Sequence, residues 1–239
     1  MQQLITGAAK LGVELNPRQL EQFQTYYVEL IDWNRQVNLT AITKPEKVNL
    51  KHFLDSLTII LAFSRPKDIN GLSIIDVGTG AGFPGLPLKI AFPSIKLTLL
   101  EATAKKTAFL KHIIQKLELE GVEVATGRAE EAAHQPQYRQ HFEVVISRAV
   151  ALLSTLVELT LPFCKTGGRI ILQKKGDIKN EIIKAGNAIS TLGGSQPQNI
   201  KIWLEELDDN RYLVVIDKIA PTPEKYPRRP GIPAKRPIM

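Results

Sequence analysis

A glycine-rich segment at residues 72–85 carries the clearest chemical signal in the chain. It reads Leu-Ser-Ile-Ile-Asp-Val-Gly-Thr-Gly-Ala-Gly-Phe-Pro-Gly, an apolar run that passes through Asp76 into a turn and then a helix. Glycine reaches positive φ and has no Cβ, so such a turn lets the backbone approach a ligand closely at a helix N-terminus. The segment therefore predicts a nucleotide-type cofactor site around Gly78, Gly80 and Gly82.

Two cofactor classes fit this segment. Residues 80–85 match the dinucleotide pattern G-x-G-x-x-G, and Glu101 follows about twenty residues later, where a carboxylate binds ribose hydroxyls. The strand is expected to end near Val77, however, so the dinucleotide pattern would begin late, some way past the strand. A motif that begins at Asp76 starts at the strand end, which is the position typical of S-adenosylmethionine enzymes. The position of the motif relative to the strand favours S-adenosylmethionine over NAD(P), whereas Glu101 suits both cofactors. A non-catalytic nucleotide fold is the third alternative.

Residues for thiol or metal chemistry are scarce. Cys164 is the only cysteine, and the four histidines show no spacing typical of metal ligands. We therefore expect neither a disulfide framework nor a metal site. His52 and Asp55 lie three residues apart on a predicted helix, and we expect them to form a structural hydrogen-bonded pair.

The order of the predicted elements points to an α/β fold. The predicted strands span 72–77, 96–101, 122–125, 142–147 and 168–173, and helices are predicted at 85–92, 103–119, 151–161 and 177–192. Such alternation is typical of a parallel sheet with helices on both faces. Residues 200–207 and 211–219 predict two further strands, joined by a tight turn at Asp208-Asp209-Asn210. A parallel sheet that ends in an antiparallel hairpin is the Rossmann-like arrangement of class I methyltransferases, with the ligand at the carboxyl ends of the strands.

The composition divides the chain into three parts. Asn16, Pro17 and Gln19 predict a capped helix start, and a second helix follows Pro45, so residues 1–70 are expected to form an N-terminal helical cap. Residues 71–220 form the predicted cofactor-binding domain. Residues 221–239 hold five basic side chains, one acidic side chain and six prolines, and so contribute +4 to the net charge of +7. We expect this tail to lie extended along RNA; a solubilising end and a structural strap are the alternatives.

No targeting or membrane segment is predicted. Residues 1–12 lack a long apolar run, and the longest one, at 57–63, is too short to cross a bilayer. We therefore expect a cytoplasmic protein that has no contact with a membrane.

Motifs spread over nearly the whole chain resemble the RsmG family (glucose-inhibited division protein B), the bacterial 16S ribosomal RNA guanine-N7 methyltransferases. The matching segments are Trp33-Asn34, Asn38-Leu39-Thr40, residues 52–57 and 76–87, Lys105-Lys106, Phe109-Leu110, Arg128-Ala129-Glu130, Ser147-Arg148-Ala149, Lys175-Gly176, and residues 211–215 and 226–237. The resemblance implies S-adenosylmethionine as cofactor and, as partner, 16S ribosomal RNA or the small ribosomal subunit at its 530 loop. We expect a monomer.

The resemblance also implies which residues hold the cofactor. They are Gly78, Phe83, Glu101, Ala102, Thr103, Ala129, Glu130 and Arg148, to which the glycine pattern adds Gly80 and Gly82. Arg148 follows a predicted strand, and its planar guanidinium suits a phosphate or the face of a base, so a role in positioning the substrate is expected beside the alternative of a structural salt bridge.

Basic residues near the ligand edge and in the tail are the predicted RNA contacts. They are Lys105, Lys106, Lys175, Arg211, Arg228 and Arg229. Lys106 lies in line with an apolar helical stripe, so its ammonium group must either snorkel or face the site opening. Tyr226 offers an unpaired base a stacking face.

The predicted chemistry needs no general base. The N7 lone pair of guanine is nucleophilic without losing a proton, so holding it in line with the methyl group supplies most of the rate. Ser147-Arg148-Ala149 stands where amino-directed methyltransferases carry Asn/Asp-Pro-Pro-Tyr/Phe. The remaining alternatives are an NAD(P)-dependent oxidoreductase and a non-catalytic RNA-binding ribosome-assembly factor.

Overall fold

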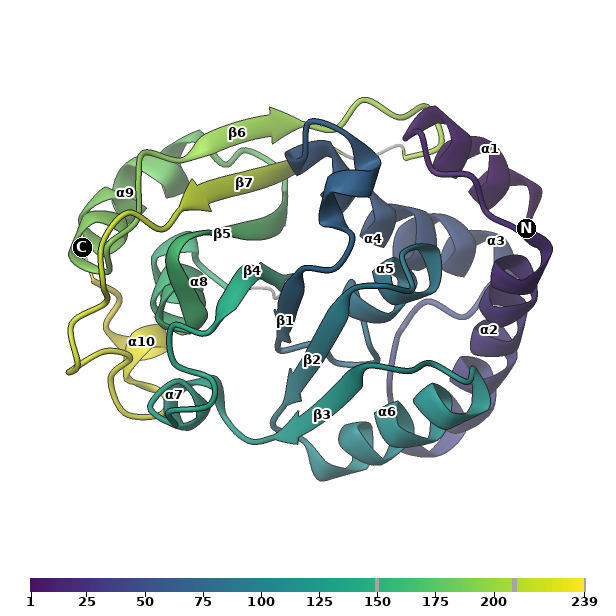
Figure 1. Ribbon diagram of the computed structural model, residues 1–239, viewed down its shortest axis with the longest axis horizontal. Helices are drawn as coiled ribbons and strands as arrows, with labels where there is room; N and C mark the ends of the chain where they lie inside the picture. Colours follow the sequence, from purple (N-terminus) through teal and green to yellow (C-terminus); the bar gives the residue numbers. More distant parts are fainter. Residues whose placement is uncertain (149–150, 208–209, 239) are drawn as a thin grey trace.

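The computed structural model describes residues 1–148, 151–207 and 210–238, and these residues form a mixed seven-stranded sheet (Figure 1). The strands are β1 Ser73–Val77, β2 Lys96–Glu101, β3 Val122–Thr126, β4 Phe142–Ser147, β5 Cys164–Lys175, β6 Gln198–Lys201 and β7 Arg211–Asp217. Their order is β3-β2-β1-β4-β5-β7-β6, with β1 to β5 parallel and β7 antiparallel to both neighbours. The predicted α/β class is confirmed.

Helices cover both faces of the sheet (Figure 1). They are α1 Gln2–Lys10, α2 Pro17–Val37, α3 Pro45–Val48, α4 Asp55–Leu57, α5 Gly85–Ala91, α6 Ala104–Lys116, α7 Ala129–Ala132, α8 Leu153–Thr160, α9 Lys179–Thr191 and α10 Ile232–Lys235. A π-helical turn, η1 Asn49–Leu54, and three 3-10 turns, η2 Thr58–Ala62, η3 Pro66–Ile69 and η4 Leu161–Phe163, complete the set. The second predicted helix of the cap is thus a run of short α, π and 3-10 segments.

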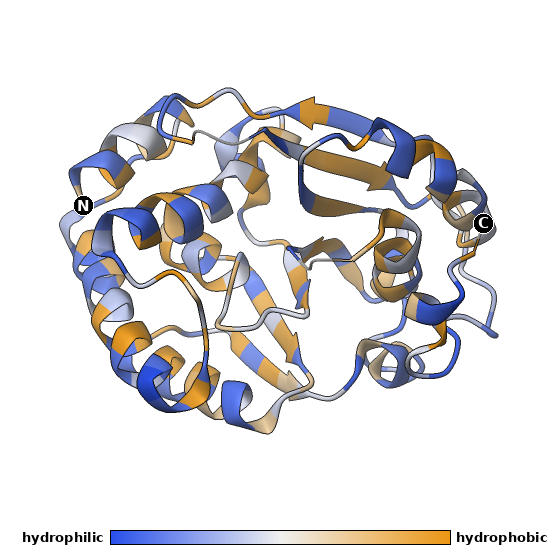
Figure 2. Ribbon diagram, turned by 180° about the vertical axis from the view of Figure 1, so that it is seen from behind, coloured by the Kyte–Doolittle hydropathy of each residue, from blue (hydrophilic) through white to orange (hydrophobic). Residues whose placement is uncertain are grey.

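The core has one hydrophobic cluster on each face of the sheet. Neighbouring residues on a strand point to opposite faces, so Ile74 packs in one cluster with Phe53, while Ile75 packs in the other with Val157. Strands buried on both faces are apolar throughout. In Figure 2 the central strands are mainly orange, whereas the surrounding helices carry both orange and blue.

The predicted helix start at Asn16 is confirmed. The Asn16 side chain accepts a hydrogen bond from the Gln19 amide, and the Gln19 side chain accepts one from the Asn16 amide, at 3.0 and 2.9 Å. The helix that begins there, α2, packs Phe23 and Leu30 into the same cluster as Ile74 of β1. The helices of residues 1–70 therefore share a core with the sheet.

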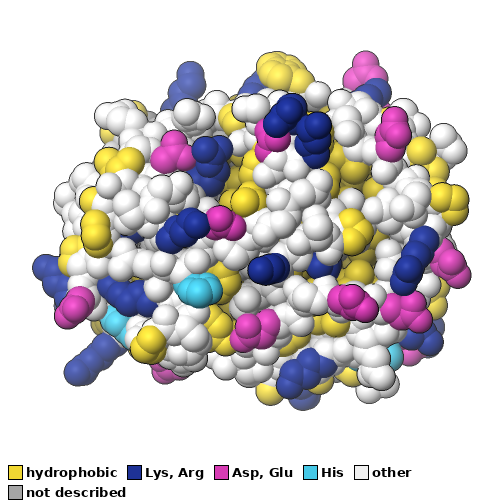
Figure 3. All heavy atoms as spheres, in the orientation of Figure 1, with side chains coloured by type: hydrophobic (Ala, Val, Ile, Leu, Met, Phe, Trp, Pro, Cys, Tyr) yellow, Lys and Arg dark blue, Asp and Glu magenta, His cyan; other side chains and the backbone are white. Residues whose placement is uncertain are grey.

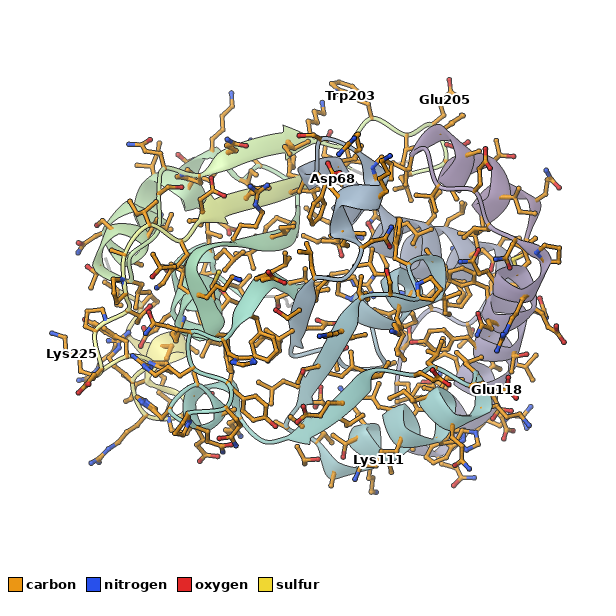
Figure 4. All side chains as sticks on the ribbon, viewed as in Figure 1. Asp68, Lys111, Glu118, Trp203, Glu205 and Lys225 are labelled. Carbon is orange, nitrogen blue, oxygen red and sulfur yellow. The ribbon has the colours of Figure 1, made fainter. Side chains whose placement is uncertain are left out.

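The predicted hairpin is correct in its pairing but wrong in its turn. β6 ends at Lys201 instead of Leu207, and the chain between β6 and β7 is a long connection, of which residues 208 and 209 of the expected turn lie outside the described part. Leu204 and Leu207 are both buried, and the Leu207 amide bonds the Leu204 carbonyl, a spacing that an extended strand does not allow. Figure 4 shows Trp203 and Glu205 of this connection at the outer surface.

The tail, which was expected to lie extended along RNA, packs against the body of the protein, as the alternative of a structural strap requires. Pro233 on α10 is buried, and its carbonyl accepts a hydrogen bond of 3.1 Å from Thr155 of α8. Arg139 donates to the carbonyls of Thr222 and Tyr226 at 3.0 and 2.9 Å. Proline has no N–H, so the tail forms little regular structure, and side chains of the body bind its carbonyls instead.

Among the described residues, we find no helix with the length and hydrophobicity that a membrane crossing requires.

Candidate active site

A pocket of about 160 Å³ opens at the carboxyl ends of β1 to β4. Its walls include Gly78 after β1, Glu101 and Ala102 at the end of β2, Gly127 and Ala129 after β3, Ser147 at the end of β4, and Leu156, Leu159 and Thr160 of α8. Four residues predicted from the sequence to hold the cofactor, Gly78, Glu101, Ala102 and Ala129, therefore meet around one pocket. Open parallel sheets bind ligands at this edge.

The glycines of the β1–α5 loop have two different roles. Gly78 and Gly80 have φ of 72° and 63°, and a Cβ at either position would meet nothing within 4 Å. Gly82 has φ of 98°, but a Cβ there would lie 2.5 Å from Tyr26 Oη of α2, which donates a hydrogen bond to the Ala81 carbonyl. Gly78 and Gly80 thus leave room for a ligand, whereas Gly82 lets α2 pack against the loop.

Glu101 is fixed by two backbone amides. Its Oε2 accepts from the Gly80 amide at 3.0 Å, and its Oε1 accepts from the Thr103 amide at 2.8 Å. A carboxylate oxygen has two acceptor sites, so each oxygen retains capacity for one more donor. Both oxygens are therefore oriented to accept the two hydroxyls of a ribose.

Asp76 holds the loop from below. Its Oδ2 accepts hydrogen bonds from Thr79 Oγ1 at 2.7 Å and from the Gly85 amide at 2.8 Å, so it joins the end of β1 to the start of α5. Burial raises the pKa of this carboxyl to about 6. The aspartate is buried under the loop, so its role is to shape the loop rather than to contact a ligand.

Arg148 lies beside the pocket in a cluster of charged and aromatic groups. Its Nη1 donates to Asp55 Oδ2 at 3.1 Å and to the Lys51 carbonyl at 3.2 Å, and its Cζ lies 5.1 Å from the centroid of the Phe83 ring. Asp55 also accepts from Arg211 Nη1, at 2.5 Å, through its other oxygen. The salt bridge that was the alternative for Arg148 is present, and it holds the guanidinium over Phe83.

His52 belongs to the same cluster and is neutral. Its ring stacks on Phe83 with centroids 4.5 Å apart, and its Nδ1 lies 3.3 Å from Nη2 of Arg148. Arginine only donates, so Nδ1 accepts and Nε2 carries the proton, which it donates to Thr40 Oγ1 at 2.7 Å. Burial, with a smaller effect of Arg148, lowers the pKa of His52 to about 3. The expected direct hydrogen bond between His52 and Asp55 is wrong: His52 bonds Thr40 and Arg148, and Asp55 bonds Arg148 and Arg211.

The comparisons with known proteins agree with this geometry. The family model for rRNA small subunit methyltransferase G matches residues 19–212. A protein of that name from Dehalococcoides mccartyi (strain CBDB1) is 53% identical over 100% of both chains, and one from Alkaliphilus metalliredigens (strain QYMF) is 47% identical over 97% of this chain and 96% of its own. The chain belongs to the rRNA small subunit methyltransferase G family. The resemblance found in the motifs is thus confirmed.

Solved structures show the same fold at low sequence identity. An O-methyltransferase from Bacillus cereus in complex with SAH has a TM-score of 0.56 and 18% identity, covering 81% of this chain and 90% of its own. A SAM-dependent methyltransferase from Aquifex aeolicus has a TM-score of 0.54 and 16% identity, covering 74% and 94%. These likenesses support the class I methyltransferase fold for this family member.

The pocket of this methyltransferase G family member fits S-adenosylmethionine. Glu101 would offer a ribose a carboxylate with free acceptor capacity, and the loop has open space at Gly78 and Gly80. Small side chains at Ala102 and Ala129 leave room for a flat ring. Thr103, at the start of α6, contributes the amide that orients Glu101. In the described part of the chain, no cluster of three or more His, Cys, Asp or Glu could hold a metal ion.

Two predicted RNA contacts need correction. Arg211 is 2% exposed and is paired with the buried Asp55, so its guanidinium does not reach the surface. Arg228 makes a fork with Glu158, from Nε to Oε1 at 2.9 Å and from Nη2 to Oε2 at 2.6 Å. Both arginines neutralise buried carboxylates, which cannot be left unpaired.

The other predicted RNA contacts are accessible to different degrees. Lys105, Lys175 and Arg229 are exposed, and Lys106 is half-buried, in line with its place beside an apolar stripe. In the view of Figure 3, Lys and Arg side chains are interspersed with Asp and Glu. The four residues stay predictions.

The sequence reasoning missed the pair between Asp55 and Arg211. One signal was available: Asp55 lies in the apolar run Phe53-Leu54-Asp55-Ser56-Leu57, and Arg211 begins the apolar strand β7. A charge in a segment that is otherwise buried requires a partner of opposite sign. The sequence alone does not say which of the available charges that partner is.

Proposed function

We propose that this protein transfers a methyl group from S-adenosylmethionine to N7 of a guanosine in 16S ribosomal RNA of the small subunit. The choice of N7 as the methylated atom rests on which ionisable side chains line the pocket. Among the described residues that line it, Glu101 is the one ionisable side chain, and its oxygens are directed by the Gly80 and Thr103 amides. A nucleophile that must lose a proton needs a base, whereas N7 does not.

The neighbouring ionisable groups support the same choice. His52 has a pKa of about 3 and uses both ring nitrogens in hydrogen bonds, so it is a poor proton acceptor near neutral pH. Asp76 is buried beneath the loop with its Oδ2 bonded twice. A reaction in which no proton moves in the transferring step is compatible with both groups.

We attribute the acceleration of methyl transfer to the positioning of the two reactants. When bound, S-adenosylmethionine would supply a methyl group on a positively charged sulfur, which would keep the electron pair of the broken C–S bond while N7 gives its lone pair to the methyl carbon. Glu101 orients the ribose, the turn at Gly78 permits close approach, and Leu156 and Leu159 of α8 keep water from one wall of the pocket. Correct orientation of two reactants is worth about 7–11 kcal/mol in favourable systems, so such a site needs no acid or base.

RNA recognition is proposed for the accessible basic groups. Arg148 is held over Phe83 by Asp55, where its guanidinium can position the target guanosine or a neighbouring phosphate. Lys105, Lys106, Lys175 and Arg229 would contact phosphates. We further propose that the protein acts as a cytoplasmic monomer.

The test uses small subunits that lack the modification. The protein is incubated with these subunits or with protein-free 16S ribosomal RNA, together with labelled S-adenosylmethionine, and the nucleosides are identified by mass spectrometry. We expect N7-methylguanosine in at least one of the two substrates. A different methylated nucleoside would contradict the proposed N7 chemistry. Binding of NADH without binding of S-adenosylmethionine would support the oxidoreductase, and binding without turnover would support the assembly factor.

A further inference from the structure

The tail contacts the two helices that form one side of the cofactor pocket. Ala129 of α7 and Leu156 and Leu159 of α8 line the pocket. Their sequence neighbours Glu130, Thr155 and Glu158 face the tail and bond it. In Figure 1, α10 of the tail lies between α7 and α8. We call residues 222–233 the strap.

The strongest of these contacts joins Arg228 to Glu158. Glu158 is fully buried on α8, and its two oxygens accept from the Arg228 guanidinium at 2.9 and 2.6 Å, with a third bond of 2.9 Å from the Arg228 amide. Arg228 also donates to the Arg236 carbonyl at 2.7 Å. A buried carboxylate that loses such a partner must find water or move, so α8 depends on the strap for its position.

A second set of contacts joins the strap to α7 and the chain that follows it. The Gly231 amide donates to Glu130 Oε1 at 3.0 Å, next to the pocket residue Ala129. Beyond α7, His134 Nε2 lies 2.8 Å from the Pro227 carbonyl. The Arg139 guanidinium donates both to the carbonyl of Ala133, which directly follows α7, and to the strap carbonyls.

The short length of α7 makes these contacts important. It has four residues, Ala129–Ala132, and isolated helices shorter than about 12 residues are marginal in water. Its position therefore depends on tertiary contacts, and Gly231 of the strap provides one of them through Glu130. Two other strap residues, Arg228 and Pro233, bond α8, so both helices are anchored to the same segment.

We infer that the strap is a positioning element for the cofactor: it holds α7 and α8 at the separation that S-adenosylmethionine requires. Arg228 acts through Glu158 and does not touch the ligand itself. This inference rests on the proposed function, because it takes S-adenosylmethionine as the ligand. It predicts that loss of the Arg228–Glu158 contact weakens binding of the cofactor while binding of RNA changes much less.

The test is calorimetric titration of the full-length protein with S-adenosylmethionine. We expect Arg228→Ala to raise the Kd about fivefold or more, which is the lower end of the usual coupling between separate sites. Lys235→Ala is the matched control, because it removes one positive charge from an exposed side chain of the tail just beyond the strap. The control should bind the cofactor as the unchanged protein does. Equal affinity in all three proteins, or equal weakening in both variants, would overturn the inference.

Arg228→Lys is a second variant that keeps the test decisive if the Arg228→Ala protein does not fold. Lysine keeps the charge beside Glu158 but cannot form the fork, so the variant should fold and bind the cofactor with intermediate affinity. Hydrogen exchange should be faster in residues 129–133 and 153–160 of this variant and unchanged in α2. Unchanged cofactor affinity in a folded Arg228→Lys protein would overturn the inference. If the unchanged protein bound no S-adenosylmethionine, the proposed function itself would fail, so the two failures are distinguishable.

Discussion

A glycine-rich loop lines the cofactor pocket and a proline-rich strap packs behind one of its walls, and the contacts that hold these two regions differ. The β1–α5 loop has contacts inside its own segment, where Asp76 bonds Thr79 and Gly85, three and nine residues away, beside longer ones from Glu101 to Gly80 and from Tyr26 to Ala81. The strap is held by distant residues: Arg228 bonds Glu158 across 70 residues, and Gly231 bonds Glu130 across 101. The loop is therefore shaped partly by its own segment, whereas the contacts named for the strap all come from distant parts of the chain.

Because of this difference, we expect the loop to affect cofactor binding directly and the strap to affect it indirectly. The loop places backbone at the ligand itself, with open space at Gly78 and Gly80. The strap acts through α7 and α8. Changes in the loop should therefore abolish binding of the cofactor, and changes in the strap should weaken it by degrees. The predictions below run from the largest expected effect to the smallest.

Gly80→Val should abolish measurable binding of S-adenosylmethionine. Valine would project into the open space at the loop, and its positive φ of 63° adds a strain of roughly 1–2 kcal/mol. Gly186→Ala on α9 is the control, because a Cβ there also meets nothing within 4 Å but the position is helical. Calorimetry measures both. Wild-type affinity in a folded Gly80→Val protein would place the ligand elsewhere.

Asp55→Ala should lower the free energy of unfolding by about 3–5 kcal/mol, because it leaves Arg148 and the buried Arg211 without their shared carboxylate. Chemical denaturation measures the change. Asp32→Ala, which removes an exposed partner of Arg35, serves as the control and should change stability by less than about 1 kcal/mol. Equal losses in the two variants would mean that the buried cluster contributes no more than a surface pair.

Arg148→Ala should reduce the single-turnover rate of methyl transfer by roughly tenfold or more, which corresponds to about 1.4 kcal/mol in the barrier. The calorimetric affinity for S-adenosylmethionine, measured in parallel, shows how much of the loss arises at the cofactor. A normal rate in this variant would leave Arg148 with only its salt bridge to Asp55.

His52 should contribute to acid sensitivity. Its pKa is about 3 in the folded protein and 6.5 in the unfolded chain, so the unfolded chain binds the extra proton between these values. Its contribution is therefore complete above about pH 6.5 and is lost as the pH falls toward 3. The fall in melting temperature from pH 7 to pH 4.5 should be smaller in His52→Gln than in the unchanged protein. An equal fall would contradict the assignment of a neutral, buried ring.

The same contrast of near and distant contacts explains how much could be predicted. Local sequence patterns predict the strands β1, β2 and β4 and the helix cap at Asn16. The rule that parallel strands share a carboxyl edge predicts that Gly78 and Glu101 lie close together. The end of β6 at Lys201, the pair of Asp55 with Arg211 and the packing of the strap depend on residues far along the chain. Charge and proline content in the tail favoured an extended arm, because composition does not show that Glu158 lies buried opposite Arg228.

The claim of transfer without a general base is tested most directly by the single-turnover rate of methyl transfer to small-subunit RNA, measured from about pH 6 to pH 9 with saturating S-adenosylmethionine. The account predicts a rate that is independent of pH from about pH 7 to pH 9, because N7 loses no proton and His52 stays neutral throughout. Protonation of Asp76, whose pKa is about 6, affects only the lower end of the range. A bell-shaped profile, or an inflection that disappears when one side chain of the pocket is replaced, would contradict it.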